Sequence, residues 1–144
     1  MEFEHFDQAV ADAFADIHRE QTGLPAFLGL RVDSVAAGRM VVSIDAREEF
    51  HNPFGSMHGG VIAGLVDHVL GAVLYPVIPR GYWAATTEFK LNYLAPVRTG
   101  VVTAEANIIS MTKRTAVVRI EVTNDGRPVA AAQGTVLIQQ PKGS

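Results

Sequence analysis

The amino-acid sequence predicts an α+β fold in which an antiparallel sheet curls around one long helix. The helix is expected at residues 61–75, VIAGLVDHVLGAVLY, which are apolar on almost every side and therefore need to be enclosed by other structure. The chain after this helix alternates between apolar and polar residues with the period of two that strands show. With 144 residues, 48% of them hydrophobic and 19% charged, we expect a single domain over residues 1–144.

The segment before the central helix predicts a short helix and a pair of strands. Its apolar residues recur every three or four positions, as on one face of a helix: Phe6, Val10, Phe14 and Ile17. Gly23 and Pro25 then interrupt the pattern, so residues 1–24 are expected to hold this helix and a linker. Residues 28–35 and 39–44 predict two strands that a short Ala-Ala-Gly turn joins into a hairpin.

Four more strands are expected after the central helix, at residues 84–93, 101–109, 115–123 and 129–138. The Asn-Asp-Gly sequence at 124–126 predicts a tight hairpin turn between the last two strands, because these residues tolerate positive φ. We expect the four strands to form a meander. Residues 139–144 are expected to be a polar tail.

Composition and charge exclude several classes of function. The net charge of -3 argues against nucleic acid as a partner, because Lys and Arg must neutralise phosphates in such complexes. The absence of cysteine excludes disulfides, thiolate metal sites and a cysteine nucleophile. The N-terminus, MEFEHFDQ, lacks the pattern of a signal peptide, and residues 61–78 are interrupted by Asp67, His68 and Pro76, unlike a membrane span. We therefore expect a cytoplasmic protein without a membrane partner.

A glycine-rich loop leads into the central helix. Residues 51–60, HNPFGSMHGG, have the composition of a loop and end in Gly59 and Gly60. A helix N-terminus presents free N–H groups and the positive end of the helix dipole, which suit a developing oxyanion. The alternative is that both glycines only permit a tight turn.

Asp67 stands in the middle of the apolar helix, where a buried carboxylate costs several kcal/mol unless it is paired. One interpretation is a general base or nucleophile, and the other is a carboxylate at the rim that caps a neighbouring backbone group. Gly59 and Asp67 are eight residues apart, about 12 Å along one helix, so one chain cannot supply both to the same carbonyl. If both act in catalysis, the site is shared across a dimer, and Asp67 must be covered rather than face bulk solvent.

These residues resemble a known family. Asn52, Gly55, His58-Gly59-Gly60 and Asp67, followed by TTEFKLNYLAPVRTG, are similar to the hotdog-fold thioesterases of the phenylacetate-degradation (PaaI-like) type over about residues 25–138. The resemblance implies a homodimer that hydrolyses acyl- or aryl-CoA thioesters, with coenzyme A as part of the substrate and no separate cofactor. It also implies that two dimers pair through an exposed sheet face into a homotetramer.

The resemblance also assigns roles to single residues. Asp67 would activate water or attack the thioester carbonyl, and the Gly59 N–H would bind the carbonyl oxygen. Asn52 would hold the lytic water or the thioester, and His58 would orient the thioester and the loop. Thr86 would position the water beside Asp67.

Four further residues are candidates for substrate binding: Phe54, Gly60, Lys113 and Arg114. Phe54 would line the acyl pocket, although aromatic residues are more often part of a core. Lys113 stands where the family usually has glycine, and with Arg114 it would favour the phosphates of coenzyme A. The alternative for this pair is a solvated turn.

Other chemistries fit less well. Ser56 lacks the Gly-x-Ser-x-Gly spacing of a nucleophile elbow, and His51, His58 and His68 lack metal-ligand spacing, so no metal is expected. A hotdog enoyl-CoA hydratase or dehydratase needs a carboxylate and a histidine that converge, whereas Asp67 and His68 diverge around the helix. A non-catalytic acyl-CoA-binding protein is the remaining alternative.

Overall fold

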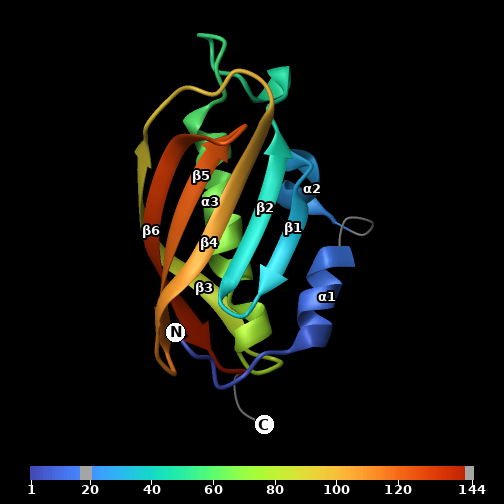
Figure 1. The fold of residues 1–144 in the computed structure, drawn as a ribbon, viewed down its shortest axis with the longest axis vertical. Coiled ribbons are helices and arrows are strands. Elements are labelled where there is room, and N and C mark those ends of the chain that lie inside the picture. Colours follow the sequence, from blue (N-terminus) through green and yellow to red (C-terminus); the bar gives the residue numbers. More distant parts are fainter. Residues whose placement is uncertain (17–20, 142–144) are drawn as a thin grey trace.

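The computed structural model describes residues 1–16 and 21–141 (Figure 1). In chain order its elements are α1 Gln8–Asp16, α2 Gly23–Leu28, β1 Arg31–Ala36, β2 Arg39–Asp45, the 3-10 turn η2 Glu48–Phe50, α3 Gly59–Ala72, the 3-10 turn η3 Tyr75–Val77, β3 Trp83–Tyr93, β4 Val101–Met111, β5 Thr115–Asn124 and β6 Arg127–Gln139. The strands form one antiparallel sheet that curls around α3, which confirms the predicted fold class. Ile17, the last apolar residue of the predicted N-terminal helix, lies outside the described residues.

The strand order in the sheet is β1-β2-β4-β5-β6-β3. β4, β5 and β6 form a meander as expected, but β3 pairs with β6 rather than with β4, so the predicted four-strand meander is wrong for its first strand. The connection from β3 to β4 passes over one end of the sheet (Figure 1), where the Leu94 N–H donates to the Val129 carbonyl at 2.8 Å. The alternation of apolar and polar residues along a strand indicates which face is buried but not which strand is its neighbour. It therefore could not predict this crossover.

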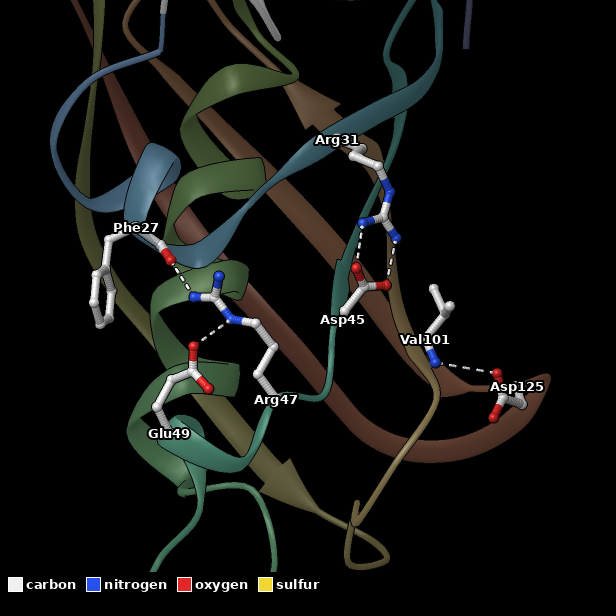
Figure 2. Close-up of polar contacts among 7 residues, drawn as sticks. All are labelled: Phe27, Arg31, Asp45, Arg47, Glu49, Val101 and Asp125. Atoms are coloured by element: carbon white, nitrogen blue, oxygen red, sulfur yellow. Dashed lines mark hydrogen bonds and ion pairs between the residues drawn. The ribbon is translucent and has the colours of Figure 1, made fainter.

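The turn between β5 and β6 holds the end of that crossover. Asp125 and Gly126 have φ of 48° and 83°, which confirms the predicted hairpin turn. The Asp125 carboxylate accepts a hydrogen bond from the Val101 N–H at 3.1 Å (Figure 2), and the Asn124 side chain donates to the carbonyl of Thr99 at 2.9 Å. The chain at the start of β4 is therefore tied to a turn 24 to 25 residues further along.

α3 packs one face into the concave side of the sheet. The residues of that face are buried: Ile62, Leu65, Val66, Val69, Leu70 and Ala72. The stretch Gly59–Val77 is long and apolar enough to span a membrane by composition, with a mean hydropathy of 1.6, but 56% of it is buried inside the fold. Its apolar character is therefore explained by its contact with the sheet. The helix ends at Ala72 rather than continuing to Tyr75, because the chain tightens into η3.

α2 is a helix that the sequence pattern did not predict. It includes Leu28, and Gly29 closes it with φ of 65°, so the strand predicted from residue 28 begins only at Arg31. A helix of six residues is too short to show a periodic pattern, and the Pro25 taken as a helix breaker lies in its first turn, where proline is tolerated. A Cβ added to Gly64 would lie 3.6 Å from Leu24, so α2 rests on α3 at this glycine.

Arg47 connects α2 to the segment that leads to the glycine-rich loop (Figure 2). Its guanidinium donates to the Phe27 carbonyl at the end of α2 and lies 4.2 Å from the centre of the Phe50 ring. Its Nε is 3.2 Å from Glu49 Oε1, an ion pair that lacks the alignment of a hydrogen bond. One side chain thus holds two segments that adjoin the helix N-terminus.

The N-terminal segment is attached to the opposite end of α3. Asp7 accepts two hydrogen bonds from Arg80 at 2.6 and 3.1 Å, and its N–H donates to the Pro76 carbonyl at 2.7 Å. The hydrogen bond from Arg80 is the largest of the effects that lower the pKa of Asp7 to about 2. The amphipathic α1 follows directly, and its Phe14 ring packs 6.0 Å from that of Tyr75.

Candidate active site

The N-terminus of α3 carries a free backbone donor. The Gly60 N–H donates to His58 Nδ1 at 2.8 Å, and the Val61 N–H donates to the His58 carbonyl at 2.9 Å, so His58 caps the helix. Among residues 1–16 and 21–141, no group accepts a hydrogen bond from the Gly59 N–H. The donor predicted from the sequence is therefore available, while its role toward a substrate stays a prediction.

Asn52 holds the loop that precedes this helix. Its Oδ1 accepts from the N–H groups of Phe54 and Ser56 at 2.9 and 3.3 Å, and its Nδ2 donates to Ser56 Oγ at 3.1 Å. In the single chain the Asn52 amide is thus used to shape the loop, and its predicted contact with water or thioester is untested. Phe54 lies at the loop tip with 89% of its surface exposed, so it is not a core residue of the protomer.

A pocket of about 420 Å³ opens beside the start of α3. It is lined by Met57, Gly59, Ile62, Tyr93 and residues 94–97 of the crossover. The Tyr93 hydroxyl donates to the Gly59 carbonyl at 2.8 Å, which joins the end of β3 to the first residue of α3. Tyr93 was not among the predicted site residues, since only the fold brings it to the helix N-terminus.

Asp67 is exposed in the single chain, so the cover predicted for its carboxylate would have to come from another protomer. α3 is not covered on all sides. An open strip along it has Gly60 and Asp67 exposed and Gly71 half-buried, and α2 rests on it at Gly64. Gly60, Asp67 and Gly71 follow one another around the helix at intervals of seven and four residues, so they share a face. The sequence pattern did not reveal the open strip, because its glycines add no polar side chain to the apolar run.

His68, the neighbour of Asp67, points to a more enclosed side of α3. Burial lowers the pKa of His68, and the nearby Asp67 carboxylate partly offsets this. The two side chains are about 100° apart around the helix, as expected for adjacent residues. Because the two side chains do not converge on one point, the structure gives no support to the hydratase alternative.

Thr86 lies on the face of β3 that looks toward α3. It pairs with Val136 of β6, which is fully buried on the helix side of the sheet. A bulge follows between Thr86 and Glu88, so the alternation of β3 shifts by one residue after this point. The register therefore places Thr86 on the same side of the sheet as the helix that carries Asp67.

The two basic candidates lie far from Gly59 within one chain. Lys113 and Arg114 form the turn between β4 and β5, and Lys113 lines a second cavity of about 650 Å³ together with residues 77–79 and 1–5. This cavity is beside η3, at the C-terminal end of α3. Because α3 has 14 residues, its two ends are about 21 Å apart. Gly59 and Lys113 of one chain consequently do not adjoin the same pocket.

Comparison with known proteins agrees with this architecture. The model of the thioesterase superfamily matches residues 54–131. The 1,4-dihydroxy-2-naphthoyl-CoA hydrolase of Listeria monocytogenes is 34% identical over 103 residues, 72% of this chain and 84% of that protein. A thioesterase-like phenylacetic acid degradation-related protein from Ralstonia eutropha is 26% identical with a TM-score of 0.76, covering 86% of this chain and 98% of that one. The PaaI protein of E. coli shares the fold, with a TM-score of 0.81 over 91% of this chain and 94% of its own at 24% identity. This chain belongs to the thioesterase superfamily and is a hotdog-fold thioester hydrolase of the PaaI-like type.

Proposed function

We propose that this enzyme hydrolyses acyl- or aryl-CoA thioesters to the free acid and CoA, in a site that two protomers share. The main support is the separation of Gly59 and Asp67 along one continuous helix, about 12 Å. A base and an oxyanion donor must both lie within a few ångströms of one carbonyl. Two copies of α3 meet this requirement when Gly59 of one protomer faces Asp67 of the other.

The surface of the protomer supports such a dimer. β3 is at the edge of the sheet and pairs only with β6 among the described strands, so its other edge presents free backbone groups over 11 residues. The open strip of α3 beside it contains Gly60 and Gly71, whose small size permits close approach of a second helix. A second copy on this surface would cover Asp67 and supply the desolvation that its own chain does not provide.

In the proposed reaction the Asp67 carboxylate takes a proton from water as the water oxygen attacks the thioester carbonyl carbon. The Gly59 N–H of the other protomer, at the positive end of the α3 dipole, stabilises the oxyanion of the tetrahedral intermediate. The C–S bond then breaks, and the proton held by Asp67 passes to the leaving sulfur, which yields the acid and CoA. Direct attack by Asp67, through an anhydride that water then hydrolyses, gives the same products.

The remaining predicted contacts belong to the same proposal. Thr86 would orient the water, Asn52 and His58 would orient the thioester, and Phe54 and Gly60 would contact the acyl group. Lys113 and Arg114 are both exposed and positively charged, which suits the phosphates of CoA. Since they lie at the other end of α3 from Gly59, we propose that they come from a protomer other than the one that supplies Gly59.

Mixed dimers test the shared site. Asp67→Asn removes the base, and Gly59→Pro removes the N–H. The backbone suits proline at the first helical position after an extended His58 (ψ 134°), and the added Cβ displaces the exposed end of the Tyr93 side chain in the same chain. Each variant alone should release free thiol at least about a hundredfold more slowly than the wild type from a panel of short, long and aryl CoA thioesters. When the two are co-expressed at equal levels, one intact site in half of the dimers should restore about one quarter of the wild-type activity.

The outcomes of this experiment separate the alternatives. No activity in the mixed dimers would place the base and the donor in the same chain and contradict the shared site. Binding of acyl-CoA by the wild type without release of thiol would instead favour the non-catalytic alternative. A cytoplasmic location and the pairing of two dimers are further proposals, and light scattering would distinguish twice from four times the chain mass.

A further inference from the structure

Tyr93 joins the end of β3 to the first residue of the catalytic helix. Its hydroxyl donates to the Gly59 carbonyl at 2.8 Å, and its ring lines the pocket of about 420 Å³ in which Gly59 lies. The side chain is not a core residue, because 55% of Tyr93 is exposed. Because the exposed Tyr93 side chain adds little to the core and its hydroxyl donates to the first residue of α3, we look for its role at this helix N-terminus.

The peptide between Gly59 and Gly60 is held at both of its polar atoms. Tyr93 binds its carbonyl oxygen, and the imidazole of His58 binds its N–H at 2.8 Å. Two successive glycines have more backbone freedom than any other pair of residues, so this first turn depends on such contacts for a defined direction. The Gly59 N–H is on the adjacent peptide, whose His58 carbonyl accepts from the Val61 N–H at 2.9 Å, so both peptides that meet at the Gly59 Cα are held and the direction of the Gly59 N–H is restricted.

The Tyr93 ring also restricts what residue 59 can be. A Cβ added to Gly59 would lie 2.8 Å from both Cζ and the hydroxyl oxygen of Tyr93, closer than real Cβ contacts. Glycine therefore lets the ring lie directly against the backbone of residue 59. The contact is available because β3, which ends at Tyr93, pairs with β6 and so has its last residue beside this end of α3.

We infer that Tyr93 is a positioning residue, which together with His58 aligns the Gly59 N–H with the oxyanion of the thioester intermediate. The inference rests on the proposed function, because it takes the Gly59 N–H as the oxyanion donor. A positioning residue acts on the transition state more than on substrate binding, so its loss lowers kcat and leaves KM nearly unchanged. A contact that served only stability would instead lower the melting temperature and leave kcat per folded enzyme unchanged.

Tyr93→Phe removes the hydroxyl and keeps the ring. We expect kcat to fall about tenfold, since one neutral hydrogen bond orients the donor, with KM within about twofold of wild type. The melting temperature should stay within about 2 °C, because the hydroxyl is near the surface. Tyr75→Phe is the matched control: its hydroxyl is 3.5 Å from the Ala84 N–H at the other end of α3, and this variant should keep the wild-type kcat.

A double-mutant cycle of Tyr93→Phe with His58→Ala tests whether the two side chains act through the same peptide, the one between Gly59 and Gly60. If both contacts are needed to orient this peptide, loss of either one already misaligns it. The fold-decrease in kcat of the double variant should then be smaller than the product of the two fold-decreases of the single variants. Wild-type kcat in Tyr93→Phe, a rise in KM alone, or independent effects in the cycle would each overturn the inference. A different result would contradict the proposed function itself, namely turnover retained in Asp67→Asn.

Discussion

The two faces of α3 differ in what they contribute to the protein. The face toward the sheet consists of fully buried residues such as Leu65, Val66 and Val69, whose removal from water stabilises the fold. The open strip holds Gly60, Asp67 and Gly71, and it contributes little burial within one chain. A carboxylate is thus kept on a strongly apolar helix at a position that faces the uncovered side of the helix rather than the core.

The largest effect is expected at Asp67. Asp67→Asn should lower turnover of acyl-CoA thioesters by about 10²–10⁴-fold, as loss of a general base does. The melting temperature should stay at or above that of the wild type, because within residues 1–16 and 21–141 the exposed carboxylate takes part in no hydrogen bond or ion pair. A thiol-release assay and a thermal melt on the same sample measure both. A variant that unfolds more easily would show that the open strip is part of the core.

Leu65→Ala examines the opposite face of the same helix. Leu65 is completely buried, so the cavity should lower the free energy of unfolding by about 2–5 kcal/mol. Chemical denaturation measures this change, and activity per folded molecule should persist at low temperature. Loss of activity without loss of stability would reverse the assignment of the two faces.

Gly71→Arg adds a large charged group to the open strip. A Cβ at Gly71 meets nothing within 4 Å, so the protomer should fold, while the dimer should weaken by about tenfold or more. Sedimentation at several concentrations measures the dimer, and activity should fall in parallel because the proposed site is shared. Ala13→Arg on the exposed side of α1 is the control and should leave both unchanged. An intact dimer in Gly71→Arg would exclude this strip from the interface.

The smallest effect concerns the ion pair of Asp7 with Arg80, far from both faces of α3. The folded-state pKa of Asp7 is about 2, below its ordinary value of 3.8, so the pair stabilises the protein above about pH 4 and loses this effect as the pH falls toward 2. Arg80→Ala should therefore lower the melting temperature at pH 7 by a few degrees at most and match the wild type near pH 2. Melts across this pH range test it, and a difference that persisted at pH 2 would point to lost packing instead.

Much of the fold could be predicted from local pattern. The apolar run at α3, the alternation of β5 and the Asn-Asp-Gly turn each have a physical cause within a few residues. α2 was missed because six residues that include Gly23 and Pro25 give no periodic signal, and the place of β3 was missed because pairing depends on a distant strand. For the site, the free Gly59 N–H was expected from the helix start alone, whereas Tyr93 lies beside Gly59 only because β3 pairs with the distant β6.

Sequence by itself determined that a single apolar helix must be wrapped by a sheet, that a glycine pair begins this helix, and that one carboxylate lies two turns further along. These follow from periodicity and from helix geometry, which act between near neighbours. Tertiary structure decided that Asp67 is on the uncovered side, that Asn52 and His58 bond to their own loop, and that Lys113 adjoins the far end of α3. These positions depend on which distant segments pack together. The free energy of that packing comes from the whole core, so no single stretch of the chain determines it.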